Sequence, residues 1–348
     1  MRSAAINDLD FFLLEVPSAP GRTLIVRLVD EHAVEGWGEA ACSWRVTETS
    51  ARRDAILPAV TGRSVFDVEE LLTWELFADP PLRCAMEMAS WDLVGRVLDQ
   101  PLSHLMGGAY RRRIPVALRV EAASDDETVH LTRQLADQGF HSLVVPASGD
   151  LDRDVALSRR IRENAGTRIE LRLDAQERYD IETAAELCSL LEQGAVEFLV
   201  DPVPANDPAE LQPLQRRTMV PLAARRCIRR PRDVLHAVGR ETSGLVVIDL
   251  QRVGGILPSR KSAAVAEAAG AAACLAQSRS LGLATAAMLQ VAACTPAFTF
   301  HNETPHESLD RAVLTEPFDV SDGMVAVPQG PGLGIRVDRK KVERFQVA

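Results

Sequence analysis

From residue 113 to residue 311, strand-like patterns alternate with helical patterns, and this alternation constrains the fold more than any other feature. The strand-like segments are Ile114–Val120, Ser142–Val145, Ile169–Asp174, Glu197–Val200, Val220–Ala223, Gly244–Ile248, Ala271–Leu275 and Phe298–His301. The helical segments between them are Asp126–Gln138, Asp150–Asn164, Ile181–Gln193, Pro208–Gln215, Arg230–Val238, Ile256–Ala269 and Leu281–Ala293. Eight repeats of this size, the last one incomplete, are typical of a (β/α)8 barrel rather than of a doubly wound sheet.

The segments before and after the barrel predict a small α+β domain. Three strand-like segments, Phe11–Val16, Thr23–Val29 and Val34–Ala41, precede three helical ones, Thr47–Val60, Asp67–Phe77 and Pro81–Leu98. The tail contains a Pro/Gly-rich stretch and is predicted to return to this domain. We therefore expect an α+β capping domain at 1–112, a modified (β/α)8 (TIM-like) barrel at 113–311, and a C-terminal segment at 312–348 that rejoins the cap.

Charge and cysteine usage exclude several function classes. The net charge of −10 argues against nucleic acid or an anionic membrane as a partner, because both require a basic surface. The six cysteines are scattered without a CxxC pair, so a zinc site is not expected. The sequence contains no apolar run of membrane-spanning length and no signal-peptide pattern, so a cytoplasmic location is the expectation.

Asp174 is the first candidate functional residue. It ends the strand-like run IELRLDAQ, in which charged and apolar residues alternate, and it precedes a helical segment. In α/β barrels the carboxyl ends of the strands hold the chemistry. Neighbouring strands must then supply the partners of Asp174.

Five motifs recur in an order that is specific to one group of proteins. They are Gly36–Ala40 (GWGEA), Ala85–Gly95 (AMEMASWDLVG), Pro101–Gly108 (PLSHLMGG), Val253–Ile256 (VGGI) and Gly330–Gly334 (GPGLG). In order and spacing the chain resembles the enolase superfamily, most closely its muconate-lactonizing and mandelate racemase-like members. That resemblance implies a modified barrel capped by an α+β domain built from both chain ends. It also implies Mg²⁺ on three carboxylates, where the ion stabilises an enolate formed when a base removes a proton beside a carboxylate.

The metal ligands carry over only in part. Asp174 matches the ligand on the third barrel strand, and Asp201 replaces the usual glutamate on the fourth. On the fifth strand the acidic residue is replaced by Arg225 or Arg226, depending on the alignment. Mg²⁺ is therefore possible from the resemblance, and the preferred interpretation is that an arginine guanidinium takes its place and pairs bidentately with one carboxylate.

The bases of the family are also replaced. The Lys-x-Lys positions of the second strand hold Val144 and Pro146, which cannot carry a proton, and the sixth-strand lysine is replaced by Asp249. Asp249 suits the aspartate of an Asp–His pair, but Ala271–Ser280 contains no histidine. His301, at the end of the eighth predicted strand, is a weaker candidate base facing the barrel mouth.

Gln277 and Arg279 follow the seventh strand, where the family contacts the carboxylate end of its substrate, so they are the candidate substrate-binding residues. Arg119 and Arg172 are expected to form structural salt bridges rather than to hold a substrate.

Two hypotheses follow. In the first, metal-assisted proton abstraction is lost, and the chain keeps a pocket for a small carboxylate or serves as a scaffold. In the second, it is an active isomerase or lyase, such as a muconate cycloisomerase, o-succinylbenzoate synthase or dipeptide epimerase, with Asp249 or His301 as base. The resemblance also leads us to expect a homo-oligomer.

Overall fold

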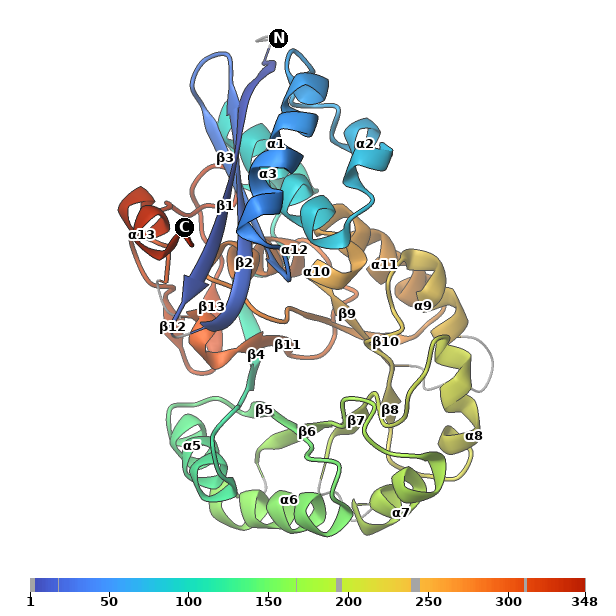
Figure 1. Ribbon diagram of the computed structural model, residues 1–348. Coiled ribbons are helices and arrows are strands. Elements are labelled where there is room, and N and C mark those ends of the chain that lie inside the picture. The colour runs from blue at the N-terminus through green and yellow to red at the C-terminus, as the bar shows by residue number, and fades with distance from the viewer. Residues whose placement is uncertain are drawn as a thin grey trace.

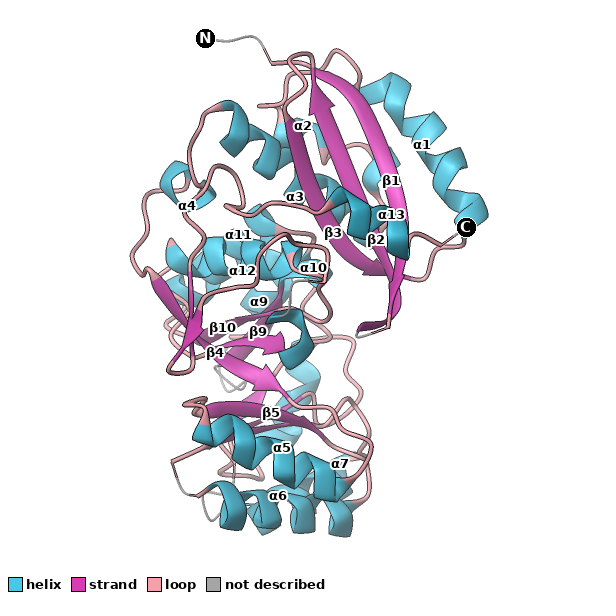
Figure 2. Cartoon of the chain, turned by 90° about the vertical axis from the view of Figure 1, so that its left-hand side faces the viewer, coloured by secondary structure: helices cyan, strands magenta, loops and turns pink. Residues whose placement is uncertain are grey.

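In the computed structural model, which describes residues 4–17, 19–166, 168–191, 196–238, 245–309 and 312–347, a barrel of parallel strands lies beside a separate antiparallel sheet (Figures 1 and 2). The barrel strands are β4 (Arg113–Arg119), β5 (Ser142–Pro146), β6 (Glu170–Asp174), β7 (Phe198–Val200), β8 (Leu222–Ala223), β9 (Leu245–Asp249), β10 (Ala272–Ala276) and β11 (Asn302–Pro305). Their order is β8-β7-β6-β5-β4-β11-β10-β9, and a parallel bridge between Ala224 and Val246 joins the two ends. The predicted fold class is confirmed.

Helices surround the barrel on its outer side (Figure 1). They are α5 (Asp125–Asp137), α6 (Leu151–Ala165), α7 (Ile181–Leu191), η2 (Pro208–Leu211), α8 (Gln212–Gln215), α9 (Pro231–Ala237), α10 (Leu250–Val253), α11 (Ile256–Ala268) and α12 (Leu283–Ala293). These bounds follow the sequence pattern closely. The predicted segment ends at Gln193 and Gly244 and the predicted boundary at residue 311 lie outside the described residues.

The eighth strand is displaced from its predicted position. Phe298–His301 reads as a strand because its residues are aromatic and β-branched, but in this stretch only Phe298 forms an isolated bridge, with Ala273. The ladder is instead made by the polar residues of β11, which pair in parallel with β4. Because these residues are polar, the sequence pattern does not mark them as a buried strand. In the barrel the amide oxygen of Asn302 accepts the backbone N–H of Leu275, and the Glu303 carboxylate accepts from Arg225.

The cap consists of the antiparallel sheet β1 (Ile6–Val16), β2 (Ala19–Asp30) and β3 (Glu35–Cys42), together with helices. These are α1 (Val46–Val60), α2 (Val68–Leu71), η1 (Glu75–Phe77), α3 (Pro80–Val97) and α4 (Leu102–Leu105). Helix α3 packs closely on β3, and a Cβ at Gly36 or Gly38 would lie 2.2 or 2.1 Å from carbonyl oxygens of that helix. The glycines of the GWGEA motif therefore allow the helix backbone to touch the strand.

The C-terminal segment contacts both parts of the molecule. Strand β13 (Met324–Ala326) pairs with β12 (Val320–Ser321) and with β4, the first barrel strand. After helix α13 (Arg339–Phe345), Gln346 forms an isolated bridge with Leu14 of β1. Among the described residues, no helix is long and apolar enough to cross a membrane.

Two buried glutamates join the cap to the barrel. Glu39 of β3 accepts hydrogen bonds from the backbone N–H groups of Leu281 (2.9 Å) and Ala284 (2.6 Å) at the start of α12. Glu87 of α3 accepts them from Ile256 and Leu257 at the start of α11, both at 2.7 Å. Helix N-termini offer unpaired N–H groups and a favourable dipole, so each carboxylate satisfies donors that burial would otherwise leave unpaired.

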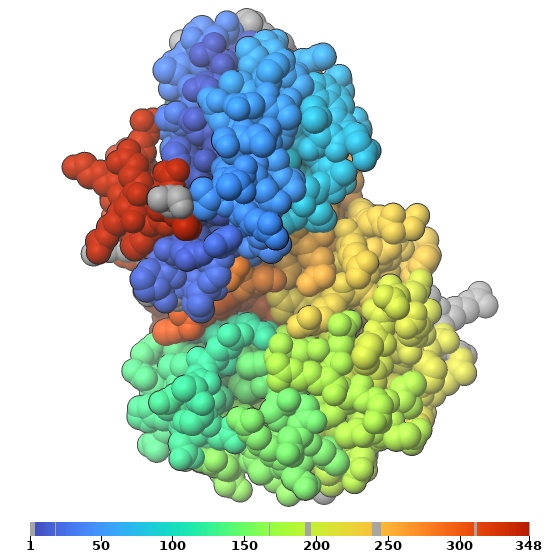
Figure 3. Space-filling model, in the orientation of Figure 1, coloured from blue at the N-terminus to red at the C-terminus, as the bar shows by residue number. Residues whose placement is uncertain are grey.

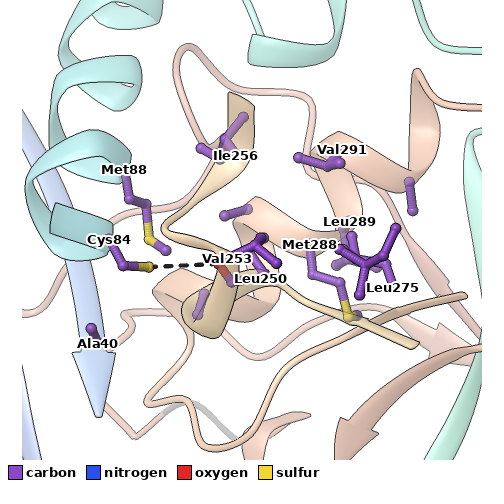
Figure 4. Packing of buried hydrophobic residues seen from close by; sticks show 14 of the residues in the cluster. Ala40, Cys84, Met88, Leu250, Val253, Ile256, Leu275, Met288, Leu289 and Val291 are labelled. Carbon is purple, nitrogen blue, oxygen red and sulfur yellow. Dashed lines mark hydrogen bonds between the residues drawn. The ribbon is translucent and has the colours of Figure 1, made fainter. Parts of the chain in front are cut away.

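Apolar side chains fill the space between these polar junctions. Figure 4 shows Cys84 and Met88 of α3 facing Leu250, Val253 and Ile256 of the barrel, with the Cys84 thiol directed at the carbonyl oxygen of Leu250. The cap and the barrel thus share one continuous core, and we expect them to unfold together.

Glu87 should make stability depend on pH. Burial raises the pKa of Glu87 to about 7 from its ordinary 4.5, despite the two N–H donors that lower it. The folded chain then binds this proton more tightly than the unfolded chain, so stability is lost as pH rises through this interval, by up to about 3 kcal/mol. We expect Glu87→Gln to remove that loss when unfolding free energies are compared between about pH 5 and pH 8. Glu70→Gln, an exposed cap substitution, is the control, and equal slopes for wild type and Glu87→Gln would contradict the expectation.

Candidate functional site

A hollow of about 540 Å³ opens where the carboxyl ends of the barrel strands meet the β1–β2 end of the cap. Figure 3 shows the cap, in blue, seated on the barrel, in green to orange. The charged residues that line the hollow are Arg119, Arg225, Arg226, Arg252, Arg279, Glu121, Asp174 and Glu307. Arginines outnumber acids here, although the chain as a whole carries a net charge of −10. The hollow is therefore suited to an anionic small molecule.

Asp174 lies at the inner wall of this hollow, as the last residue of β6. Its carboxylate accepts a hydrogen bond from Nη1 of Arg119 at 2.6 Å and one from the backbone N–H of Gln176 at 3.1 Å. Burial alone would raise the pKa of Asp174, but the guanidinium groups of Arg119 and Arg225 outweigh it and hold the pKa below its usual value. Asp174 is thus an ionised carboxylate whose counter-charges come from arginines.

Arg225 is the arginine that occupies the fifth-strand position. Its Nη2 lies 2.8 Å from Oδ2 of Asp249, and its Nη1 lies 3.3 Å from Oε2 of Glu303 and 3.9 Å from Oδ2 of Asp174. The preferred interpretation expected a bidentate pair with one carboxylate. The guanidinium instead reaches three carboxylates on β6, β9 and β11, strands that are not neighbours in the barrel sheet. These three carboxylates raise the pKa of the buried Arg225 above its already high value, despite its burial.

Glu303 is one of the three carboxylates around Arg225, and the sequence pattern did not predict it as a site residue. Because the eighth strand was predicted to end at His301, Glu303 was placed beyond the barrel. In the structure it lies on β11 and is 2% exposed, between the guanidinium groups of Arg225 and Arg172. Asn302–Pro305 (NETP) shows no alternation of apolar and polar residues, so the pattern that located the other strands gives no signal for this one.

Asp201 is held by backbone N–H groups of the segment after β8. Its Oδ1 accepts the backbone N–H of Arg225 at 2.8 Å, and its Oδ2 accepts that of Arg226 at 3.0 Å. Burial raises the pKa of Asp201 to about 7. The residue also adopts a left-handed backbone with φ of +44°, a conformation that is held by its surroundings. Asp201 therefore fixes the turn after β8 that presents Arg225.

Asp249 is surrounded by donors on both oxygens. Oδ1 accepts the backbone N–H groups of Gln251 and Arg252 at the start of α10, and Oδ2 accepts Nη2 of Arg225 and the hydroxyl of Ser278. Burial would raise the pKa of Asp249, but Arg225 and Ser278 outweigh burial and hold this pKa below its usual value. A carboxylate held in this way is a weak base, because taking up a proton would cost these hydrogen bonds.

The residues of this site do not fit a magnesium ion. Mg²⁺ requires oxygen ligands about 2.0–2.1 Å away in an octahedral arrangement. Here the guanidinium of Arg225 stands among Asp174, Asp249 and Glu303, and Asp201 is engaged by backbone N–H groups. Within the described part of the chain, no three His, Cys, Asp or Glu side chains are grouped so that they could hold a metal ion. The guanidinium of Arg225 would repel a divalent cation bound to the same carboxylates.

His301 lies at the opposite end of the barrel, so its expected place at the mouth is wrong. It precedes β11, and its Nδ1 lies 3.1 Å from Oε2 of Glu170, the first residue of β6, whereas Asp174 is the last. Burial lowers the pKa of His301. The second-strand positions, Val144 and Pro146, pair with Arg172 and Asp174 in the register of β5 and β6 and supply no base.

Of the two candidate substrate contacts, one lines the hollow and one does not. Gln277 is buried, and its amide nitrogen donates to the hydroxyls of Thr285 (2.7 Å) and Thr304 (2.6 Å). Arg279 lines the hollow and donates to the carbonyl oxygens of Pro20 and Arg22, the latter at 3.0 Å. Arg279 therefore ties the β1–β2 end of the cap to the barrel mouth.

Arg172 is a structural residue, as expected. Its side chain is fully buried in the barrel, donates to Glu197 at 2.7 Å and lies 3.3 Å from Glu303. Its guanidinium also stands 4.6 Å from the ring centre of Phe198. Since Glu303 contacts Arg172 on one oxygen and Arg225 on the other, the charges alternate along the barrel interior up to the mouth.

Comparisons with known proteins agree across the whole chain. Residues 127–341 match the family described as "Enolase C-terminal domain-like", and residues 19–107 match "Mandelate racemase / muconate lactonizing enzyme, N-terminal domain". Muconate cycloisomerase 1 of Rhodococcus opacus is 29% identical over 344 residues, covering 92% of this chain and 90% of that protein. L-Lys-D/L-Arg epimerase of Methylococcus capsulatus is 28% identical, covering 95% and 92%. The crystal structure of muconate cycloisomerase from Pseudomonas fluorescens superimposes with a TM-score of 0.90 at 20% identity, covering 100% of both chains.

Proposed function

The chain belongs to the mandelate racemase/muconate lactonizing enzyme family of the enolase superfamily, and from this premise we propose that it has lost Mg²⁺-assisted proton abstraction and binds a small carboxylate through arginines. The observation that carries the proposal is the position of Arg225. Its guanidinium lies among the carboxylates of Asp174, Asp249 and Glu303. It supplies the positive charge that these buried groups require.

The hollow supports the binding part of the proposal. Arg119, on β4, and Arg279, after β10, line it at the barrel rim, with β11 between their strands. Arg279 makes no ion pair within 4.0 Å with any carboxylate of the described residues, and its guanidinium donates to the backbone carbonyl oxygens of Pro20 and Arg22. Such a guanidinium can bind an incoming carboxylate without first breaking an ion pair.

Removal of a proton beside a carboxylate has no support from the residues at the mouth. An enolate intermediate carries two negative charges and needs a concentrated cation close to the oxygen that gains charge. Arg225 already shares its charge among three carboxylates, and the pKa of Asp249 is lowered, so neither group offers what the reaction demands. Val144 and Pro146 stand where a base would have to be.

The relatives favour a second candidate function, an active isomerase or lyase. Muconate cycloisomerase, epimerase and o-succinylbenzoate synthase relatives each cover at least 92% of this chain. This alternative requires Arg225 to swing away so that a metal can meet Asp174 and Asp201. It therefore predicts that a divalent ion stabilises the wild-type chain.

A thermal unfolding experiment separates the two candidates. We expect the midpoint of the wild-type chain to be the same in EDTA and in about 5 mM MgCl₂ or MnCl₂, because an ion that does not bind the folded state cannot stabilise it. The measurement is differential scanning calorimetry at matched ionic strength, with NaCl as the control. A rise of about 3 °C or more with either metal would overturn the proposal and favour the active enzyme.

A further inference from the structure

A second hollow, of about 630 Å³, lies beside the barrel mouth at the junction of cap and barrel. The cap contributes residues 40, 41, 78, 80, 81 and 83 to its wall, and the barrel contributes residues that follow β8, β9 and β10. Ala41, Arg252 and Ser278 line both hollows, so the two meet at these residues. A ligand that begins in the first hollow can therefore extend into the second.

The second hollow gathers positive charge. Its charged lining residues are Arg83, Arg229, Arg230, Arg252 and Asp249. Asp249 is already paired with Arg225, and Arg230 lies 3.8 Å from Asp233. Among the described residues, no carboxylate oxygen lies within 4.0 Å of a guanidinium nitrogen of Arg83, Arg229 or Arg252. The backbone N–H groups of Arg229 and Arg252 donate to Asp233 and Asp249. Three guanidinium groups thus line the second hollow without a side-chain ion pair.

Arg83 is held in place by its surroundings. Its Nε donates to the carbonyl oxygen of Phe77 at 2.9 Å. Its stem runs over Gly254, where a Cβ would lie 3.3 Å from Cδ of Arg83 and where φ is +100°. The glycine thus gives the stem of Arg83 its space, and the backbone there is one that other residues rarely adopt. An arginine fixed at both stem and Nε loses less freedom when it binds an anion.

We propose that the second hollow is a subsite for a phosphoryl group, and that the ligand is a small carboxylic acid with a phosphoryl group at its other end. A phosphate dianion offers three acceptor oxygens, which match several guanidinium forks at once. Its two negative charges also attract the guanidinium groups of Arg83, Arg229 and Arg252 more strongly than the single charge of a carboxylate does. The carboxylate end rests on the proposed function, whereas the phosphoryl end rests on the second hollow alone.

Calorimetric binding of two simple anions tests the subsite. Inorganic phosphate and acetate are titrated at constant ionic strength into the wild type, the double variant Arg83→Gln/Arg229→Gln, and Arg279→Gln. We expect the double variant to bind phosphate at least about tenfold more weakly and acetate unchanged, since it loses charge-assisted hydrogen bonds only in the second hollow. Arg279→Gln should weaken acetate binding and leave phosphate binding unchanged. Phosphonopropionate, which carries both groups, should bind the wild type at least about tenfold tighter than phosphate.

Arg232→Gln is the matched control, because Arg232 is 65% exposed, close in sequence to Arg229 and not part of the lining. If the double variant folds poorly, Arg229→Gln alone, at an exposed position, gives the same comparison. The subsite is overturned if phosphate fails to bind, binds the double variant as well as the wild type, or is weakened by Arg279→Gln instead. A result in which phosphate depends on Arg83 and Arg229 but acetate does not bind at all would refute the carboxylate pocket and leave the phosphoryl subsite standing.

Discussion

Replacing Arg225 with methionine is expected to destabilise the chain by about 3–5 kcal/mol, the usual cost of removing one partner from a buried ion pair. Methionine keeps much of the apolar stem of arginine, so the packing loss is small. The loss arises because Asp249 and Glu303, 1% and 2% exposed, remain buried without their shared cation. Urea unfolding at neutral pH measures it directly.

The pH dependence identifies the cause of this loss. In the wild type the pKa values of Asp174 and Asp249 are lowered, so their contribution to stability is present above their unfolded pKa of 3.8 and is lost as pH falls further. In Arg225→Met, burial acts with less opposition and raises these pKa values, so the carboxyl groups take up protons at higher pH. The stability gap between variant and wild type should therefore narrow as pH falls from about 7 toward about 4.5.

Arg226 provides the control for this experiment. It is the next residue in sequence and also lines the hollow, but its side chain is 36% exposed and its carboxylate partner, Asp201, is 3.7 Å away. Arg226→Met should therefore cost no more than about 1 kcal/mol, as expected for a partly exposed ion pair. Equal losses at the two positions would show that Arg225 is not the counter-charge of the buried cluster.

The architecture was predictable because it depends on patterns that the whole chain repeats. Apolar strand segments at intervals of one helix specify a barrel, and their bounds agree with β4 to β10 within a few residues. The motif glycines at 36 and 38 were assigned to close backbone approach, and the structure places them against α3 for that reason. Such inferences require only that neighbouring residues alternate in polarity.

The site was harder to predict because it depends on register at strand ends. Strand β8 contains only Leu222 and Ala223, too few residues to show whether Arg225 or Arg226 faces inward. At the eighth strand, a shift of four residues moved His301 from the mouth to the far end and brought Glu303 into the barrel. Polar side chains on a strand are read as exposed unless their partners are known, and these partners come from distant strands.

Arg225 and Glu303 are best understood together. Glu303 contacts Arg225 through one oxygen and Arg172 through the other, so the guanidinium at the mouth is coupled to the ion pair of Arg172 with Glu197. Along the barrel interior, the acidic residues Glu197 and Glu303 thus alternate with the basic residues Arg172 and Arg225. Arg225 supplies the cation that the carboxylates at the mouth need when they are buried.

Replacing the positive charge of Arg225 with a negative one should make the fold depend on a bound metal ion. In Arg225→Glu, a fourth carboxylate joins Asp174, Asp249 and Glu303, and their mutual repulsion has no internal counter-charge. We expect this variant to have a lower thermal midpoint than the wild type in EDTA and to gain about 5 °C or more with about 5 mM MgCl₂ or MnCl₂, since an ion that binds only the folded state stabilises it. Calcium is a useful comparison, because its larger radius and flexible coordination tolerate an imperfect ligand set.

The matched control is Arg226→Glu, which adds the same negative charge one residue away, at the hollow's wall rather than among the three carboxylates. Metal should change its midpoint little. If Arg225→Glu ignores every divalent ion while Arg226→Glu responds, then Arg226 holds the place of the ion and the proposed role of Arg225 is wrong. If the wild type and both variants respond equally, the metals act elsewhere on this acidic chain. A response confined to Arg225→Glu would show that one substitution separates this barrel from a metal-binding one.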